Sequence, residues 1–206
     1  MSEPPLHVYA DVETDSLRAN LLLQIAAVGP GDQQFSAYIN PREPLPAPCT
    51  QLTGLYFHKG HLYRNGVILP AYGIRTALTL FKNWLNLLGT TVHLVFHNGF
   101  AFDAQVLVKH FDRQQIEFPL NVKVIHDTLP LFKKVLKTNK EIKDFKLASL
   151  AEFTNSLLPD AHNAISDAQC LKDICQNYIQ KEKLDVSQFL NTYQKPIEHF
   201  KNKIKK

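Results

Sequence analysis

Two carboxylates, Asp11 and Glu13, close a mostly apolar run at residues 6–13. The run is typical of a strand, whose side chains alternate between faces, so we expect both carboxylates on one face. Two adjacent negative charges repel each other and burial penalises both, a cost that a cation between them would remove. Hard divalent ions such as Mg²⁺ prefer carboxylate oxygens as ligands. Asp-x-Glu is a short motif, however, and a strand that runs out into solvent would carry it too.

Further polar residues recur where expected strands meet expected helices. His97 and Asn98 follow one strand, Asp103 lies early in the next helix, and His162 precedes Asp167 at the start of the last long helix. Ligands usually bind at strand ends of such sheets, so convergence would place four carboxylates and one histidine in one site. That set suits phosphodiester hydrolysis with two divalent ions about 3.5–4 Å apart. A histidine that titrates near neutrality can take the proton from the attacking water.

Other residues with metal-binding or catalytic side chains have simpler interpretations. His97 is predicted to be a hydrogen-bonded histidine at a strand end, because His162 already fills the catalytic role. Asp127 or Thr128 is predicted to cap the helix that follows, and Asp127 is interpreted as a helix cap rather than as a metal ligand. Cys49 lies near His58 and His61, but this group lacks a fourth zinc ligand.

The elements that must position these residues follow from hydrophobic periodicity and from turn residues. We expect five strands, at 6–13, 21–28, 34–39, 92–97 and 122–125. We expect helices at 74–88, 101–111, 129–136, 147–155, 164–181 and 186–193, with Asn163 as a possible cap of the fifth. Proline-rich residues 40–48 and glycine-rich residues 49–73 are expected to be irregular. Three strands with short links, followed by alternating helices and strands, predict an α/β fold with a mixed five-stranded sheet flanked by helices.

Length, hydropathy and cysteine usage limit the class of protein. The chain has 206 residues, 45% of them hydrophobic, enough for one domain with a large core. We place that domain at 1–185, followed by a C-terminal helix and basic tail at 186–206. No apolar run reaches the length of a membrane span, and the N-terminus lacks signal-peptide features, so no membrane partner is expected. Three cysteines without framework spacing predict a reduced intracellular compartment, cytoplasmic or nuclear.

The net charge of +4 is unevenly distributed. Residues 133–146 hold six lysines against two acidic residues, and residues 181–206 hold seven lysines against three. Each segment therefore carries +4, which leaves −4 on the remainder. Basic segments beside an acidic remainder suit an anionic polymer that meets a carboxylate site. A solvated loop and a frayed tail would carry the same lysines. The candidate phosphate contacts are Lys133, Lys134 and Lys137.

Taken together, the polar motifs resemble those of the DEDDh 3′–5′ exonucleases, whose fold is similar to ribonuclease H. The resemblance covers roughly residues 6–180, and three motifs in order make it more specific than any one of them. Within this family the chain looks most similar to the Trex-type branch and to the exonuclease-like C-terminal domain of a promyelocytic leukaemia protein isoform. The matching motifs are Asp11-Val12-Glu13-Thr14, His97-Asn98-Gly99-Phe100-Ala101-Phe102-Asp103 and His162-Asn163-Ala164-Ile165-Ser166-Asp167.

The resemblance implies a role for each of these side chains. Asp11, Glu13 and Asp167 would hold one Mg²⁺, and Asp11 with Asp103 a second, with Mn²⁺ as a substitute. His162 would be the general base. Residues that match positions around the 3′-terminal nucleotide are Leu17, Leu52, Asn98 and Phe102. The three apolar ones among them could equally be core residues. Asp15 and Ser16 stand where the family often has Thr-Gly, which affects base contacts rather than metal ligands.

The function that the resemblance implies is Mg²⁺-dependent hydrolysis of nucleic acid from 3′ ends to nucleoside 5′-monophosphates. The partner would be a nucleic acid with a 3′ end, with DNA favoured by the Trex-type motifs. The alternative is a module that keeps the fold but lacks activity and binds nucleic acid or protein, since fold alone does not establish function. An endonuclease or a nucleotide phosphodiesterase could use the same metals.

Overall fold

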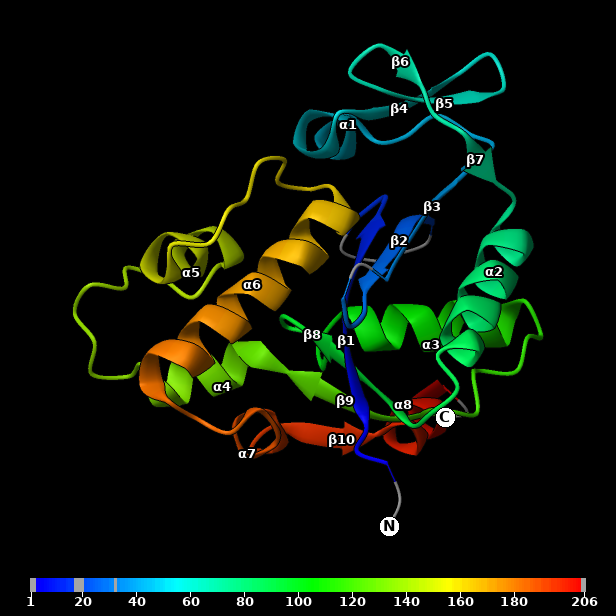
Figure 1. The fold of residues 1–206 in the computed structure, drawn as a ribbon. Helices are drawn as coiled ribbons and strands as arrows, with labels where there is room; N and C mark the ends of the chain where they lie inside the picture. Colours follow the sequence, from blue (N-terminus) through cyan, green and yellow to red (C-terminus); the bar gives the residue numbers. More distant parts are fainter. Residues whose placement is uncertain (1–2, 17–20, 32, 205–206) are drawn as a thin grey trace.

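The computed structural model describes residues 3–16, 21–31 and 33–204. Its centre is a mixed sheet of seven strands, in the order β10-β9-β8-β1-β2-β3-β7 (Figure 1). In chain order these strands are β1 (Leu6–Thr14), β2 (Leu22–Val28), β3 (Gln34–Ile39), β7 (Ala71–Tyr72), β8 (Val92–Phe96), β9 (Val122–Asp127) and β10 (Gln194–Pro196). The predicted ribonuclease H-like α/β fold is confirmed. Its five expected strands form the middle of the sheet, and the two short strands β7 and β10 extend its edges.

Strand β1 lies in the middle of the sheet, and its neighbours differ in direction. The short link to β2 makes that pair antiparallel, with Glu13 opposite Gln24. Strand β8 runs parallel to β1, with Tyr9 opposite Val95, and β9 runs parallel to β8. Parallel neighbours end at the same edge of a sheet. The carboxylate end of β1 therefore lies beside the ends of β8 and β9.

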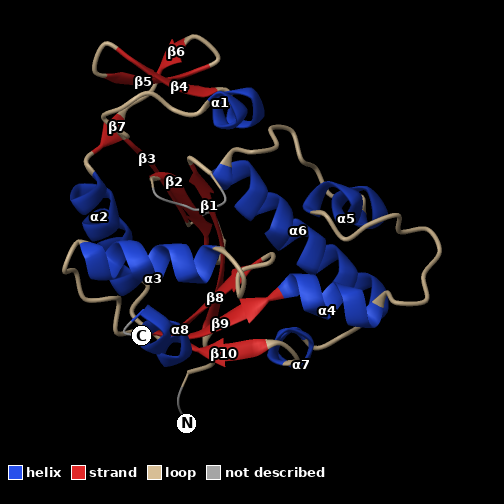
Figure 2. Cartoon of the chain, turned by 180° about the vertical axis from the view of Figure 1, so that it is seen from behind, coloured by secondary structure: helices blue, strands red, loops and turns tan. Residues whose placement is uncertain are grey.

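Helices cover both faces of the sheet (Figure 2). One face packs against α2 (Ile74–Leu87), α3 (Asp103–Arg113) and α8 (Ile197–Ile204). The other face packs against α4 (Thr128–Val135), α5 (Leu147–Thr154), α6 (Ala164–Glu182) and α7 (Val186–Asn191). The alternation of β1 serves both cores, because Val8, Ala10 and Val12 belong to the first and Tyr9 to the second.

The stretch expected to be irregular contains a short helix and a second sheet. Helix α1 (Ala47–Thr53) leads into three strands, β4 (Leu55–His58), β5 (His61–Arg64) and β6 (Val67–Ile68). Lys59-Gly60 and Asn65-Gly66 connect them, and all four residues have positive φ. Two consecutive positive φ values are the requirement of the two-residue hairpin turn. Gly60 and Gly66, in the stretch that we expected to be irregular, therefore belong to hairpin turns.

The C-terminal residues also differ from the expected helix and free tail. After α7, β10 pairs antiparallel with β9, and α8 follows it at once. Ile197 and Phe200 of α8 are buried in the core, and Phe200 lies against Phe100 with ring centroids 6.0 Å apart. Truncating a buried Phe typically costs about 3–5 kcal/mol. Lys201 and Lys203 therefore lie on a helix whose apolar residues pack into the core.

All three cysteines lie in the interior of the protein. Cys49, Cys170 and Cys175 are buried and free. Among the described residues, no helix combines the length and the apolar character needed to cross a membrane.

Candidate active site

Four carboxylates and a histidine meet at the end of β1. Candidate ligand atoms of Glu13, His162 and Asp167 lie within 4.8 Å of one another. Asp11 interacts electrostatically with Asp103, Glu13 and Asp167. The carboxylate of Asp103 accepts a hydrogen bond from the backbone of Val12, which places it against β1. The structure thus brings together five residues that the sequence separates by up to 156 positions.

Burial raises the pKa of all four carboxyl groups, and the charges of neighbouring acidic residues add to the effect. Burial, and then the charges of Asp103, Glu13 and Asp167, hold the pKa of Asp11 well above its usual range. Burial raises the pKa of Glu13 to about 8, of Asp103 to about 7 and of Asp167 to about 6. Such a cluster is costly for the metal-free fold, and bound cations would remove the cost. Oxygen-rich, negatively charged donors fit a hard divalent ion such as Mg²⁺.

Helix α6 places Asp167 beside β1. The side chain of Gln24 on β2 forms hydrogen bonds with the start of this helix. Gln24 Oε1 accepts from the backbone N–H of Ala164 at 3.0 Å, and Gln24 Nε2 donates to Asn163 Oδ1 at 2.9 Å. Asn163 occupies the N-cap position as expected, but its side chain does not cap the helix. That side chain binds Gln24 instead, because Gln24 is a buried amide in an apolar strand and needs polar partners.

The loop before α6 positions His162, whose side chain is exposed. The backbone N–H of His162 donates to Asp167 Oδ2 at 3.0 Å, so the two residues are tied directly. His162 has a φ of 61°, the left-handed region that is rare for residues with a side chain. Backbone conformations of this kind concentrate at functional sites, where the surrounding contacts maintain them.

Arg64 of the small sheet holds the same loop from the other side. It forms a two-pronged ion pair with Asp160, in which Nη2 donates to Oδ1 at 2.8 Å and Nη1 to Oδ2. Asp160 Oδ2 also accepts from Asn163 Nδ2 at 2.8 Å. Arg64 Nε donates to the carbonyl of Thr53 at 3.0 Å, which anchors the guanidinium to the end of α1. The guanidinium of Arg64, whose charge lowers the pKa of Glu13 and Asp167, is thus already paired with Asp160.

Asp127 organises the loop that leads to Asp103. Its carboxylate accepts from Leu129 N at 3.0 Å, which confirms the predicted helix cap. The same carboxylate accepts from the backbone N–H groups of Asn98 and Phe100, each at 2.9 Å. Gly99 is required between them, because a Cβ there would lie 2.4 Å from Phe96 Cβ.

His97 is a satisfied histidine at the end of β8, as predicted. Its Nε2 lies 2.8 Å from the carbonyl of Phe145, and its Nδ1 lies 2.9 Å from Thr128 Oγ1. Burial lowers the pKa of this ring. The ring therefore connects β8 to the start of α4 and to the segment before α5, and both of its nitrogens are engaged.

Comparison with known proteins gives this geometry a context. No protein-family model matches the chain. It is 27% identical over 193 residues to the chloroplastic/mitochondrial exonuclease DPD1 of Arabidopsis thaliana, covering 87% of this chain and 58% of that protein. It is 28% identical over 193 residues to the PolC-type DNA polymerase III of Listeria monocytogenes, covering 89% and 12%. The chain resembles the DEDDh-type 3′–5′ exonucleases. It spans less than two thirds of either relative's length.

Solved structures of exonucleases share the fold of this chain. Exonuclease I superimposes with a TM-score of 0.68 at 15% identity, over 86% of this chain and 41% of the other. Cell-death related nuclease 4 gives 0.66 at 18% identity, over 86% and 64%. A 3′-exonuclease that recognises a histone mRNA stem-loop gives 0.64 at 13% identity, over 88% and 65%. The resemblance to the Trex-type branch and to the promyelocytic leukaemia protein domain stays a prediction from the motifs.

The residues that we predicted to contact the nucleotide or its phosphates differ in burial and position. Leu17 falls outside the described residues. Leu52 is 59% exposed on α1, whereas Phe102 is partly buried against the core. Asn98 has a φ of 67° in the loop before Asp103. The three candidate lysines are exposed on the end of α4 and the turn after it, Lys133, Lys134 and Lys137.

The zinc group that the sequence analysis set aside does not form around Cys49. Its Sγ lies 3.6 Å from the carbonyl of Thr14 and 3.9 Å from Thr53 Oγ1, in a buried position. His58 and His61 pair with each other across the turn between β4 and β5. In the described part of the chain, neither of the clusters of metal-binding side chains includes any of these three residues.

Sequence reasoning missed two residues that position the site, Gln24 and Arg64. Gln24 could have been noticed as the single amide in the apolar run Leu-Leu-Gln-Ile-Ala-Ala-Val of β2. A polar side chain in a buried strand needs a specific partner, and this makes it a candidate positioning residue. Arg64 offers no comparable signal, because its partner Asp160 is 96 residues away in the chain.

Proposed function

We propose that this chain is a Mg²⁺-dependent 3′–5′ exonuclease that releases nucleoside 5′-monophosphates from nucleic acid, with DNA as the favoured substrate. The observation that carries the proposal is the convergence of Asp11, Glu13, Asp103 and Asp167 with His162 at one end of β1. Two exonuclease-containing relatives and several exonuclease structures of the same fold support it. The chain spans 58% and 12% of the length of these two relatives, so we propose rather than transfer their activity.

In this proposal, Asp11, Glu13 and Asp167 would hold one Mg²⁺, and Asp11 with Asp103 a second. The raised pKa values of these groups support the assignment, because burial makes their charged forms costly and a bound cation would remove that cost. Two divalent ions, which Mn²⁺ could replace, would supply Lewis-acid stabilisation of the charge that develops on the phosphodiester.

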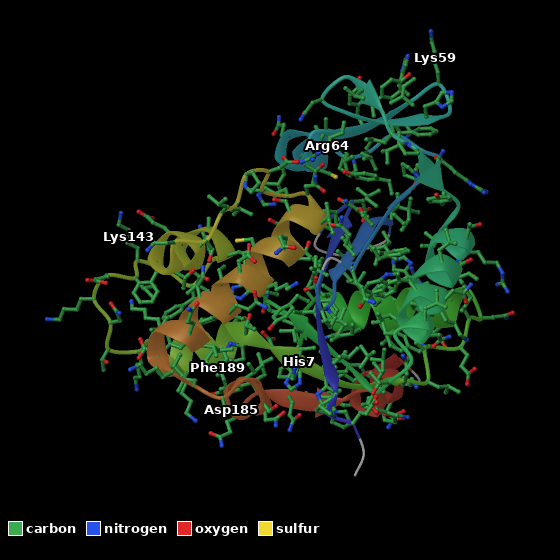
Figure 3. The ribbon with its side chains drawn as sticks, viewed as in Figure 1. His7, Lys59, Arg64, Lys143, Asp185 and Phe189 are labelled. Atoms are coloured by element: carbon green, nitrogen blue, oxygen red, sulfur yellow. The ribbon has the colours of Figure 1, made fainter. Side chains whose placement is uncertain are left out.

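His162 would act as the general base. Its exposed side chain stands beside Glu13 and Asp167, where it can accept a proton from the attacking water. The hydrogen bond between His162 N and Asp167 Oδ2 keeps the loop in register with the carboxylates. The pair Arg64–Asp160 would restrict the same loop from the side of the small sheet (Figure 3, where Arg64 is labelled).

Contacts to the nucleotide would come from residues that surround the carboxylates. Exposed Leu52 on α1 and partly buried Phe102 before α3 would pack against the 3′-terminal base, together with Leu17. Asn98 would line the same space. Leu52 is 59% exposed, which leaves its side chain accessible to a ligand. Phosphates further along the strand would meet Lys133, Lys134 and Lys137, which are exposed on and after α4.

The identity of the nucleic acid rests on the motifs and on two kinds of relative. Structures of exonuclease I include complexes with single-stranded DNA and with a dA16 oligonucleotide. The 3′-exonuclease of the same fold recognises an RNA stem-loop. The fold therefore accommodates both nucleic acids, and the Trex-type motifs lead us to favour DNA.

The test is release of the terminal nucleotide from a 3′-labelled DNA oligonucleotide, first in Mg²⁺ and then in Mn²⁺. A general base contributes about 10²–10⁴-fold to a rate, so His162→Ala should lose activity within that range. Asp167→Asn should abolish release. The matched control is His61→Ala, an exposed histidine on β5 outside the site. An RNA oligonucleotide of the same sequence tests the preference for DNA, and a circular DNA separates exonuclease from endonuclease activity.

Absence of release in either metal would contradict the proposed exonuclease. Release that persists unchanged in both His162→Ala and Asp167→Asn would contradict the assigned site. Tight oligonucleotide binding without turnover would instead favour the alternative of an inactive binding module.

A further inference from the structure

Three histidines from adjacent strands face one another away from the carboxylate cluster. His7 of β1 pairs with His93 of β8 in the sheet register, and His126 lies on the next strand, β9. The ring centroids are 5.6 Å apart for His7 and His93, 5.4 Å for His7 and His126, and 5.1 Å for His93 and His126. One candidate ligand atom from each ring lies within 4.8 Å of the other two. The proposed nuclease uses none of the three.

The hydrogen bonds of His126 already set the orientation that a metal ligand needs. Its Nδ1 lies 2.9 Å from the carbonyl of Leu190, so Nδ1 carries the proton and donates it. Its Nε2 therefore accepts the hydrogen bond from His93 Nδ1 at 3.0 Å, and a metal ion bound to both nitrogens would replace that bond. A backbone carbonyl that fixes the tautomer of a ligating histidine is the usual outer partner in metal sites.

His7 completes the group with a nitrogen that lacks a partner. In the part of the chain that the structure describes, His7 Nε2 is buried and has no hydrogen-bond partner. A buried polar atom without a partner is uncommon and calls for an explanation such as an ion. Burial lowers the pKa of both His7 and His126 to about 4, so these rings are neutral near pH 7, the form that binds transition metals.

We propose that His7, His93 and His126 form a binding site for a borderline transition-metal ion such as Zn²⁺, separate from the carboxylate site. Ligand nitrogens around a tetrahedral zinc ion are about 3.3 Å apart, given bond lengths of about 2.0–2.1 Å. The separation of 3.0 Å between His93 and His126 is close to that value. Imidazole ligands suit zinc, copper, nickel and cobalt, whereas Mg²⁺ prefers oxygen, so the two sites should select different ions.

An ion can reach this site from the surface. A pocket of about 470 Å³ is lined by His7 and Tyr9 of β1, by Lys172 and Ile179 of α6 and by Val186 of α7. Lys172 is held by the carbonyls of Gly29 and Gly31, to which its Nζ donates at 2.9 and 3.1 Å. With three protein ligands, the fourth position would be open to water.

The location of the site indicates a stabilising role. His7 and Asp11 share one face of β1, four residues apart, which is about 13 Å along a strand. In Figure 3 His7 lies toward the bottom of the molecule, and Arg64, beside the candidate active site, lies at the top. An ion at the three histidines would connect three central strands, and through His126 and Leu190 it would hold α7. The proposal does not depend on the proposed nuclease activity.

The test uses Co²⁺ and Zn²⁺ on the full chain with Asp11→Asn and Asp167→Asn, which removes two carboxylates of the other site. We expect one equivalent of Co²⁺ with the visible absorption of a nitrogen-ligated, low-coordinate ion, and an increase in the thermal midpoint with Zn²⁺ but not with Mg²⁺. His7→Gln and His93→Gln should each weaken binding at least tenfold in this background. His61→Gln, an exposed histidine on β5, is the control and should bind as before.

Two results would overturn the proposal. One is the absence of the Co²⁺ spectrum at a metal concentration tenfold above that of the protein. The other is an affinity that neither His7→Gln nor His93→Gln changes, which would place the ion elsewhere. Circular dichroism checks the fold of each variant. If His93→Gln unfolds the protein, His7→Gln at the start of β1 decides the question.

Discussion

Gln24 and Ala164 are joined by a hydrogen bond of 3.0 Å between the side chain of a central strand and the first residue of α6. Gln24 also lies opposite Glu13 in the register of β1 and β2. The same residue therefore faces one carboxylate of the site along the sheet and holds the helix that carries another. The distance between Glu13 and Asp167 depends on this amide.

Replacing Gln24 by Leu should lower both stability and nuclease activity. The substitution leaves the backbone N–H of Ala164 without its partner, and a buried donor in that state costs about 1–3 kcal/mol. We expect the free energy of unfolding to fall by that amount and kcat to fall at least tenfold. Urea unfolding and nucleotide release measure the two effects. Gln34→Leu, at an exposed position of β3, is the matched control. Unchanged kcat in Gln24→Leu would show that α6 is held by its other contacts.

The metal-free protein should lose stability as the pH rises. The folded-state pKa values of Glu13, Asp103 and Asp167 are about 8, 7 and 6, above the ordinary value near 4. A raised carboxyl pKa means that the folded state binds protons more tightly than the unfolded state. The resulting stability is complete below about pH 4 and is lost as the pH rises through 6 to 8.

The measurement is the thermal midpoint with a chelator at pH 5, 6.5 and 8. We expect a steady decrease that saturating Mg²⁺ reverses at pH 8, because a ligand that binds only the folded state stabilises it. Glu13→Gln should flatten the decrease, and Glu141→Gln, at an exposed position, should not. A midpoint that rises toward pH 8 without metal would contradict the repulsion inferred for this cluster.

Arg64→Ala should reduce activity far more than stability. The ion pair with Asp160 is partly exposed, and such pairs contribute about 0–1 kcal/mol to folding. Its other effect is to hold the loop of His162, so we expect kcat to fall about tenfold with a nearly unchanged urea midpoint. Lys201→Ala breaks a comparable surface pair with Glu198 and is the control.

Asp160→Ala and the double variant Arg64→Ala/Asp160→Ala complete a double-mutant cycle. If the pair acts as one unit, the double variant should be about as active as either single variant. Fully additive losses in kcat would mean that the two residues act independently.

Neutralising the lysines on and after α4 should weaken the salt dependence of DNA binding. Each phosphate contact to a single strand contributes about −0.7 to the slope of log affinity against log salt. The triple variant Lys133→Ala/Lys134→Ala/Lys137→Ala should therefore flatten the slope by up to about 2. Fluorescence anisotropy at several salt concentrations measures it. Lys203→Ala on α8 is the control, since that helix covers the opposite face. An unchanged slope in the triple variant would identify these lysines as a solvated surface.

Local sequence patterns were enough to predict the residues of the candidate site and the elements that carry them. Asp11 and Glu13 share a strand face because side chains alternate, and Asp103 and Asp167 fall in first turns of helices. These are local patterns, set by the next few residues. The cap at Asp127 and the satisfied state of His97 were predicted for the same reason. The two hairpins were just as local, and Asn65-Gly66 was a recognisable turn that we took for irregular chain.

How these strands, helices and loops pack together depends on contacts between residues far apart in the chain. The hydrogen bond between Gln24 and Ala164 joins residues 140 positions apart in the sequence. The bonds between Arg64 and Asp160 and between His93 and His126 span 96 and 33 positions. Strand β10 pairs with β9 and α8 packs into the core, although we predicted a basic tail from the lysines of this segment. Such contacts depend on strand order and on which helix covers which face. Burial raises the pKa of the acidic cluster and lowers that of His7 and His126, and the degree of burial is fixed by packing over the whole chain.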